Sequence, residues 1–224
     1  TILEFCRSKM SAPQTLKNFI YASSSSVYGS NKKIPFSEND NTDRPVSFYG
    51  ATKKAGEIMA QSYAHLYQIP SIGLRFFTVY GPWGRPDMSP YIFTKSILDG
   101  LPIRVFNKGE MMRDFTFIED IVSGIIGALD TPPKALNEIP PHRIYNLGNN
   151  KPVSLMDYIN VIEKACKKKA IIDLQPMQPG DVIKTYADTN ESERTLGYAP
   201  TTSIEIGIPK FVDWYLSYHS CELS

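Results

Sequence analysis

A tyrosine and a lysine four positions apart, Tyr49 and Lys53, have the residue types and the spacing of an acid–base pair. They fall in a stretch rich in Ala, Met, Glu, Gln and Lys, which predicts a helix from near Ser47 to about Gln68. Residues four apart on a helix share one face, where a lysine ammonium can stabilise a tyrosine phenolate. The pattern therefore predicts a general base.

The same spacing occurs twice more, in Tyr28/Lys32 and Tyr91/Lys95, so the surroundings must decide which pair carries chemistry. A glycine, a serine and an asparagine follow Tyr28 directly, which argues against a helix there. No strand that ends in a serine cluster precedes Tyr91. Tyr49 has both a predicted helix and a serine-tipped strand upstream, and we therefore assign the chemistry to it.

The elements that must position this pair form one α/β unit. The apolar run Asn18–Ala22 ends in four serines and Ser71–Phe77 is a second apolar run, and both predict buried parallel strands. The helix that carries Tyr49 lies between them, and Pro70 helps to end it. Similar patterns predict helices in Thr1–Met10, Pro90–Asp99, Ile118–Leu129 and Leu155–Lys169, and strands in Ile103–Phe106, Asp114–Phe117 and Arg143–Leu147.

Composition narrows the class of protein. The chain has 224 residues, 42% of them hydrophobic, and a net charge of +1, so it can bury a core but has no charge excess for holding nucleic acid or an acidic membrane. It shows no run of eighteen apolar residues and no charged-then-apolar leader. Its three cysteines are far apart and fit neither a disulfide framework nor a zinc site. We therefore expect a soluble, cytoplasmic protein without a metal.

Five blocks of sequence carry a resemblance to a known family. They are, in chain order, Ser23–Gly29, Tyr49–Lys53, Leu74–Pro82, Arg113–Ile118, and Pro179–Asp181 with Ala187–Asp188. Through them the whole chain resembles the extended short-chain dehydrogenase/reductases that act on nucleotide sugars with NAD as cofactor. The resemblance implies an α/β fold, with an incomplete Rossmann-like, doubly wound parallel sheet in residues 1–81. Residues 82–224 would form mainly a smaller α/β substrate domain, with some segments returning to the sheet.

The resemblance also implies roles for residues at the tip of the first strand and on the helix. Ser24, about twenty-five residues before the tyrosine, would hydrogen-bond the reacting oxygen of the sugar. Tyr49 would be the base and Lys53 would hold the ribose of NAD, so that all three are catalytic and the last two also bind the cofactor. Phe76 is a further candidate cofactor contact, although a phenylalanine at such a position is more often part of the core.

Further residues of the matching blocks would bind the UDP-sugar substrate. The family pattern places Arg113 at the UDP diphosphate, a role that suits the fixed fork of a guanidinium. Arg85 lies where a second nucleotide or diphosphate contact is expected, and Asp181 where the nucleotide end is bound. The alternative for each arginine is a surface ion pair, and for Asp181 a turn that follows a glycine.

The glycine-rich turn that holds the NAD diphosphate in this family has no counterpart in the sequence. Gly124 and Gly127 lie inside a predicted helix and follow no strand, so they do not supply it. Because the chain opens with Thr1, we expect that the amino-terminal part of the fold is absent and that the chain alone binds NAD poorly, if at all. We call the chain preceded by the glycine-rich segment of the family the extended protein.

The residue at position 26 helps to distinguish between the reactions that members of this family catalyse. Family members that decarboxylate or dehydrate their substrate usually carry an acidic residue there, and Ser25 with Ser26 replaces the Asp-Glu pair of dehydratases. Oxidation and re-reduction at one carbon then remain, which favours epimerisation. Gly81–Met88 is most similar to UDP-glucuronate 4-epimerases of polysaccharide pathways. Ser25, Ser26 and Thr78 would bind the C6 carboxylate through neutral donors, unless the serines bond only to their own backbone.

Other interpretations stay open at this point. The enzyme could be a UDP-galactose 4-epimerase, or a UDP-glucuronate decarboxylase or dehydratase, although Ser26 disfavours the last two. The chain could also be a non-catalytic remnant or a regulatory partner that retains a UDP site. Family dimers pack helices that include the one carrying Tyr49, which predicts a homodimer.

Replacing Ser26 with glutamate tests the assignment of this position. We expect Ser26→Glu in the extended protein to release carbon dioxide from UDP-glucuronate, because the new carboxylate can move the extra proton that decarboxylation requires. Carbon dioxide release and product analysis by proton NMR measure the change. An unaltered product spectrum would contradict the role given to position 26.

Overall fold

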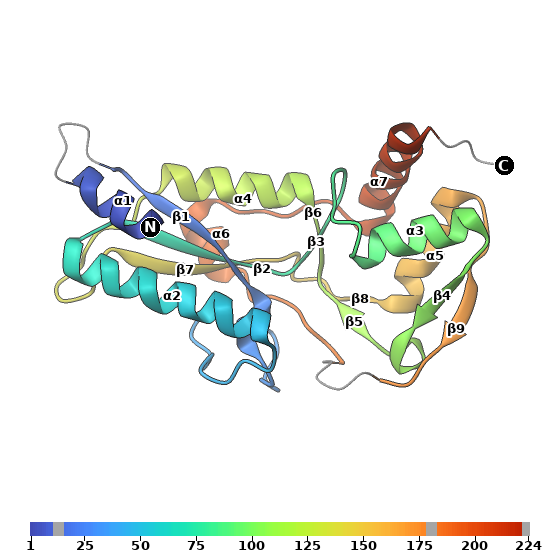
Figure 1. The fold of residues 1–224 in the computed structure, drawn as a ribbon, viewed down its shortest axis with the longest axis horizontal. Helices are drawn as coiled ribbons and strands as arrows, with labels where there is room; N and C mark the ends of the chain where they lie inside the picture. Colours follow the sequence, from blue (N-terminus) through green and yellow to red (C-terminus); the bar gives the residue numbers. More distant parts are fainter. Residues whose placement is uncertain (11–15, 178–182, 221–224) are drawn as a thin grey trace. The chain divides into compact units, whose positions relative to one another are not determined.

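The computed structural model describes residues 1–10, 16–177 and 183–220. The chain divides into two compact units, each assembled from segments that are distant in sequence (Figure 1). Unit 1 consists of Thr1–Phe77, Val122–Leu147 and Ala187–Ala199, and unit 2 of Thr78–Ile121, Gly148–Tyr186 and Pro200–Ser224. The domain ranges 1–81 and 82–224 stay a prediction.

Unit 1 is built on a parallel sheet of β1 (Phe19–Ser24), β2 (Ser71–Phe76) and β7 (His142–Leu147), in the order β1-β2-β7. The central strand β2 is buried along nearly its whole length, as expected for a parallel strand covered on both faces. The register aligns Ser24 with Phe76 and Phe76 with Leu147, so all three strands end at one edge. The predicted α/β fold with parallel strands is confirmed.

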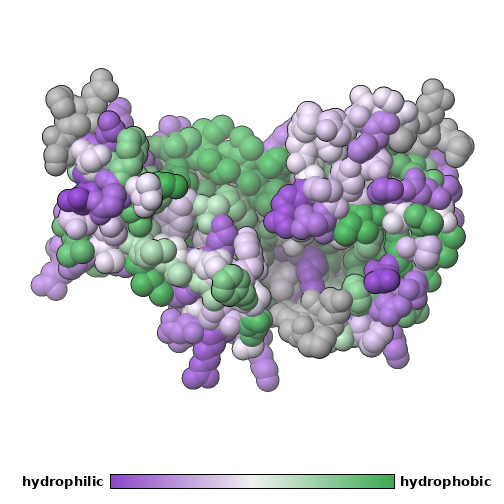
Figure 2. All heavy atoms as spheres, in the orientation of Figure 1, coloured by the Kyte–Doolittle hydropathy of each residue, from purple (hydrophilic) through white to green (hydrophobic). Residues whose placement is uncertain are grey.

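Helices cover both faces of this sheet, with α2 (Phe48–Tyr67) and α4 (Ile118–Asp130) drawn on opposite sides in Figure 1. The remaining helices of unit 1 are α1 (Ile2–Met10), the 3₁₀ turn η1 (Ser25–Tyr28) and α6 (Asn190–Leu196). Figure 2 shows apolar surface over α4, where Val122, Ile126 and Leu129 are exposed. Gly124 on the same helix lies against Leu147, so α4 packs on β7.

The bounds of α2 follow from local signals in the sequence. The Ser47 hydroxyl accepts a hydrogen bond from the amide of Gly50 at 3.0 Å, which satisfies one of the free donors of the first turn. At the other end Gln68 takes a left-handed conformation with φ 54°, and Pro70 follows. The helix therefore begins and ends where the sequence predicts it.

Unit 2 has one apolar core made by helices and short strands. Phe115 and Tyr158 stack at its centre with ring centroids 4.0 Å apart. The strands pair as β3–β6 and β4–β9 in parallel and β5–β8 antiparallel. The elements are β3 (Thr78–Tyr80), α3 (Ser89–Asp99), β4 (Pro102–Val105), the 3₁₀ turn η2 (Phe106–Gly109), β5 (Met112–Arg113), β6 (Phe115–Phe117), β8 (Val153–Ser154), α5 (Leu155–Cys166), β9 (Ile171–Leu174) and α7 (Ile204–His219).

The structure corrects the predicted end of one helix and shows strands and helices that the sequence did not predict. Helix α5 ends at Cys166 and not at Lys169, because Lys167 adopts a left-handed conformation with φ 52° and its amide turns back to Glu163 and Lys164. The sequence patterns did not reveal β3, β5, β8, β9, α6 or α7. None of the helices in the described parts of the chain is long and apolar enough to cross a membrane.

His142 links protonation to the stability of unit 1. The Nε2 atom of His142 lies 2.8 Å from the Tyr21 hydroxyl. Burial lowers the pKa of His142 from 6.5 to about 4. The negative charge of Glu57 opposes this shift, and the positive charges of Arg143 and Arg75 add to it. As the pH falls below 6.5 the unfolded chain takes up the proton first. The stability that His142 contributes is therefore fully present above pH 6.5 and is lost as the pH falls to about 4.

We expect His142→Gln to flatten this part of the pH dependence. The wild-type free energy of unfolding should fall by up to about 1.4 kcal/mol per pH unit through this group, and the variant should lack that contribution. Urea denaturation of both proteins between pH 4 and pH 7 measures the two slopes. Equal slopes would contradict the assignment.

Candidate active site

The structure brings Tyr49 and Lys53 together on the first turns of α2. The Lys53 ammonium lies 5.6 Å from the centroid of the Tyr49 ring, within the range of a cation–π contact. It also donates to the backbone oxygen of Ala22 at 3.1 Å, which ties the helix to strand β1. Tyr49 is 48% exposed.

Ser24 lies at the end of β1, two residues after Ala22, and begins the turn η1. Its hydroxyl accepts a hydrogen bond from the amide of Ser26 and donates to the Ser26 hydroxyl, both at 3.2 Å. Ser24 thus caps the turn that carries Ser25 and Ser26, and the Ser26 hydroxyl accepts the bond from Ser24. The proposed roles of Ser24, Ser25 and Ser26 toward a substrate stay predictions.

A close approach of backbones sets the start of α2 against this turn. A Cβ atom built on Gly50 would lie 2.6 Å from the carbonyl oxygen of Ser26, which is closer than real Cβ atoms come. Only glycine leaves this space, so the residue that follows Tyr49 allows the helix to touch the serine turn. The block Tyr49–Lys53 therefore contains a glycine that packing requires, Gly50, in addition to the tyrosine and lysine side chains of the candidate site.

Phe76 ends β2 beside Ser24 and is partly buried. This places it at the same edge of the sheet as the serine turn, where ligands of open α/β sheets bind. Its role as a cofactor contact stays a prediction.

Sequence reasoning missed two charged residues behind the pair. Glu57 lies one further helical turn along α2 from Lys53, and Arg75 lies on β2. The carboxylate of Glu57 and the guanidinium of Arg75 form two hydrogen bonds, of 2.8 Å and 2.9 Å, and both side chains are about 5% exposed. The repeat of four from Tyr49 through Lys53 to Glu57 was the available signal.

The predicted substrate residues of unit 2 make contacts within that unit. Arg113 on β5 donates to the backbone oxygens of Met112 at 3.0 Å and Ile183 at 3.2 Å. The amide of Thr78 on β3 donates to the backbone oxygen of Asp114 at 3.2 Å. Substrate binding by Arg113 and Thr78 stays a prediction.

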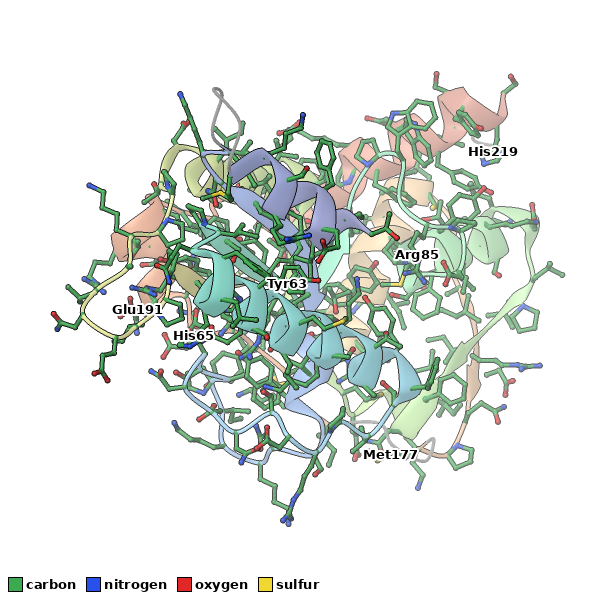
Figure 3. The ribbon with its side chains drawn as sticks, turned by 60° about the vertical axis from the view of Figure 1, so that its left-hand side comes forward. Tyr63, His65, Arg85, Met177, Glu191 and His219 are labelled. Atoms are coloured by element: carbon green, nitrogen blue, oxygen red, sulfur yellow. The ribbon has the colours of Figure 1, made fainter. Side chains whose placement is uncertain are left out.

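Arg85, labelled in Figure 3, precedes α3 and forms an ion pair with Asp87, with both side chains more than 60% exposed. The guanidinium lowers the pKa of the Asp87 carboxyl through its hydrogen bonds. The alternative of a surface ion pair is thus present for Arg85. Asp181 lies outside the described residues.

Within the described ranges 1–10, 16–177 and 183–220, no group of three or more His, Cys, Asp or Glu side chains could hold a metal ion.

Fold and site together define the short-chain dehydrogenase/reductase class. A parallel sheet carries a serine turn at its carboxyl edge, and the helix packed on it presents a tyrosine and a lysine four residues apart.

Comparison with known proteins refines this class. Residues 1–148 match the model of the NAD dependent epimerase/dehydratase family, and the chain belongs to that family. It is 49% identical over 229 residues to UDP-glucuronate 4-epimerase 4 of Arabidopsis thaliana, covering 98% of this chain and 52% of the relative. It is also 48% identical to Protein CapI of Staphylococcus aureus, covering 91% and 64% of the two chains.

A solved structure agrees with these relatives. The UDP-glucuronic acid 4-epimerase of Bacillus cereus, in complex with UDP-glucuronic acid and NAD, is similar with a TM-score of 0.84 and 34% identity, covering 97% of this chain and 65% of that chain. The curated relatives that match it best are longer proteins, and the chain spans between 51% and 67% of the length of the first eight.

Glycine substitutions on α2 test the contact between helix and serine turn. We expect Gly50→Ala to lower the free energy of unfolding by about 1–3 kcal/mol, because the new methyl group would collide with the carbonyl of Ser26. Gly56 lies on the same helix with nothing within 4 Å of a built Cβ. Gly56→Ala should therefore raise the free energy of unfolding by about 0.5–1 kcal/mol.

Urea denaturation of the two alanine variants and the wild type measures this difference. The two substitutions are chemically identical, so helix propensity alone predicts the same sign for both. Stabilisation by Gly50→Ala would show that α2 does not need the close approach.

Proposed function

We propose that the extended protein interconverts UDP-glucuronate and UDP-galacturonate by NAD-dependent epimerisation at C4. The observation that carries this proposal is the placement of Tyr49 and Lys53 on one face of α2, with Lys53 bonded to the end of the strand that leads into Ser24. Relatives named as UDP-glucuronate 4-epimerases, at 46–49% identity, support the choice of substrate.

Part of an NAD site fits the residues present. The Lys53 ammonium has three donors and uses one on the oxygen of Ala22, so two others suit the hydroxyls of the nicotinamide ribose. Bound NAD would supply reversible hydride transfer at C4. The sequence carries no G-x-G-x-x-G motif, so the cofactor's diphosphate needs the segment that the extended protein adds.

The protein's own residues then handle the proton. Tyr49 as phenolate takes the proton of the C4 hydroxyl while Ser24 hydrogen-bonds the same oxygen, and Tyr49 returns the proton when C4 is reduced on its other face. Lys53 holds the ribose and stabilises the phenolate by its positive charge.

Binding of the UDP-hexuronic acid follows from charge and donor chemistry. Arg113 and Arg85 suit the diphosphate through their guanidinium forks, and Asp181 the nucleotide end. The pair of Arg85 with Asp87 is exposed, and such pairs contribute little stability, so a diphosphate can compete for the arginine. Ser25, Ser26 and Thr78 offer neutral donors to the C6 carboxylate. The homodimer, the cytoplasmic location and the polysaccharide pathway stay predictions from sequence.

Removing the Tyr49 hydroxyl tests the mechanism. We expect Tyr49→Phe in the extended protein to lower kcat by about two orders of magnitude or more, because the C4 proton loses its acceptor. Proton NMR of UDP-glucuronate follows the change of the C4 proton couplings as UDP-galacturonate forms.

Tyr91→Phe is the matched control, since Tyr91 has the same spacing to a lysine but its hydroxyl pairs with His219 on α7. This variant should keep the wild-type kcat. Turnover of UDP-galactose alone, or release of carbon dioxide, would refute the proposed reaction within the family. Binding of UDP without any turnover would favour a non-catalytic protein.

A further inference from the structure

Glu57 continues the spacing that joins the two candidate catalytic residues on α2. Tyr49, Lys53 and Glu57 follow each other at intervals of four, so each lies one turn beyond the last on the same side of the helix. Exposure falls along the series, from a half-exposed Tyr49 to a Glu57 that is only 4% exposed. Figure 3 views this helix, with Tyr63 and His65 labelled in its later turns.

The carboxylate of Glu57 joins α2 to both neighbouring strands. One oxygen accepts from the Ser23 hydroxyl at 2.7 Å and from the Arg75 Nε at 2.8 Å, and the other accepts from the Arg75 Nη2 at 2.9 Å. This is the bidentate geometry in which a guanidinium and a carboxylate fix each other's orientation. Helix α2 is therefore held to the last residues of β1 and to β2 by one group.

The remaining terminal nitrogen of the Arg75 guanidinium is hydrogen-bonded as well. Its Nη1 donates to the Tyr28 hydroxyl at 3.0 Å, and that hydroxyl donates to the Asn146 side-chain oxygen on β7 at 2.6 Å. The guanidinium also lies 4.8 Å from the centroid of the Tyr28 ring. The ion pair is thus connected to all three strands of the sheet.

Glu57 keeps its charge in this buried place. Burial by itself would raise the pKa of its carboxyl, but the hydrogen bonds and charge of Arg75, the Ser23 hydroxyl and the charge of Lys54 outweigh burial and leave the pKa lowered. Lys54 lies 3.8 Å from the second carboxylate oxygen. An ionised Glu57 therefore faces Arg75 at neutral pH.

Two successive turns of α2 are bonded to two successive residues of β1. Lys53 donates to Ala22, and Glu57 accepts from Ser23, directly before Ser24. We propose that the Glu57–Arg75–Ser23 cluster is a positioning device that holds Tyr49 and Lys53 in register with Ser24. The proposal rests on the epimerase function above. A misplacement of about 1 Å at reacting groups can lower a rate about a hundredfold.

The first test is hydrogen exchange in the 224-residue chain, which needs no activity. Glu57→Gln keeps the size of the side chain but places an amide against the Arg75 guanidinium. We expect the backbone amides of Lys53 and Lys54 to exchange at least about tenfold faster in this variant, because the first turns of α2 lose their attachment.

Glu163→Gln is the matched control. Glu163 is a second buried glutamate, at 8% exposure, that pairs with Lys169 and accepts from the amide of Ala170 on unit 2. Its replacement removes a buried carboxylate of similar kind without touching α2. It should leave exchange at Lys53 and Lys54 as in the wild type.

The second test separates positioning from mere stability in the extended protein. Glu57→Gln should lower kcat at least about tenfold and leave KM for UDP-glucuronate within about twofold, since Lys53 no longer holds its place beside Tyr49. Glu163→Gln should change neither constant. If Glu57→Gln fails to fold, Ser23→Ala, which removes only the bond to β1, should lower kcat in the same way.

The outcomes distinguish the two proposals. If the wild-type extended protein does not convert UDP-glucuronate, the proposed function fails and hydrogen exchange alone decides the positioning role. If the wild type is active and both Glu57→Gln and Ser23→Ala retain kcat within twofold, the cluster is structural only and the inference is overturned. Unchanged exchange at Lys53 and Lys54 in Glu57→Gln would overturn it as well.

Discussion

The buried ion pair of Glu57 and Arg75 is the interaction on which the arrangement of unit 1 depends. Removing two charges from water is costly, and the attraction offsets that cost only when the geometry is good and the remaining donors and acceptors are satisfied. Here Ser23 and Tyr28 supply those further bonds. Breaking such a pair by removing one partner typically costs about 3–5 kcal/mol. Losing one partner would therefore leave the other charge buried and unpaired between α2 and the sheet.

The parallel strands connect the ion pair of Glu57 and Arg75 to the edge of the sheet at which the candidate site lies. Because the strands run in one direction and are in register, Ser24, Phe76 and Leu147 end at the same edge. The ion pair joins α2 to the sheet one residue behind that edge, where Arg75 precedes Phe76, while the serine turn and the start of α2 lie at the edge. A buried network that is rigid and fully bonded can in this way support exposed groups that must meet solutes.

The three Tyr-x-x-x-Lys segments show that the same spacing occurs in quite different structural surroundings. Tyr28 is buried in a 3₁₀ turn, where its hydroxyl bridges Arg75 and Asn146. On α3 the Tyr91 hydroxyl pairs with His219, and Lys95 pairs with Asp99. Only the segment on α2 directs its lysine to the end of a strand. Spacing on a helix places two side chains together, but the neighbouring elements decide what they contact.

Local signals in the sequence determined much of the fold and the location of the candidate site. The cap Ser47 and Pro70 bound α2, apolar runs marked β1, β2 and β7, and the motif blocks indicated the family. These signals act over a few residues, so one sequence is enough to read them. Short strands such as β5 and β8 lack a period long enough to detect.

Only the tertiary structure decided which distant residues complete these elements. Helix α7 forms although it contains Gly207 and Pro209, because the missing Cβ of Gly207 lets it pack on Tyr80 and Phe117. Glu57 likewise reads as an ordinary polar helix residue until Arg75, eighteen positions away, is placed beside it. Such pairings are selected by burial and by the need to satisfy buried polar groups, which are properties of the packed chain and not of any local segment.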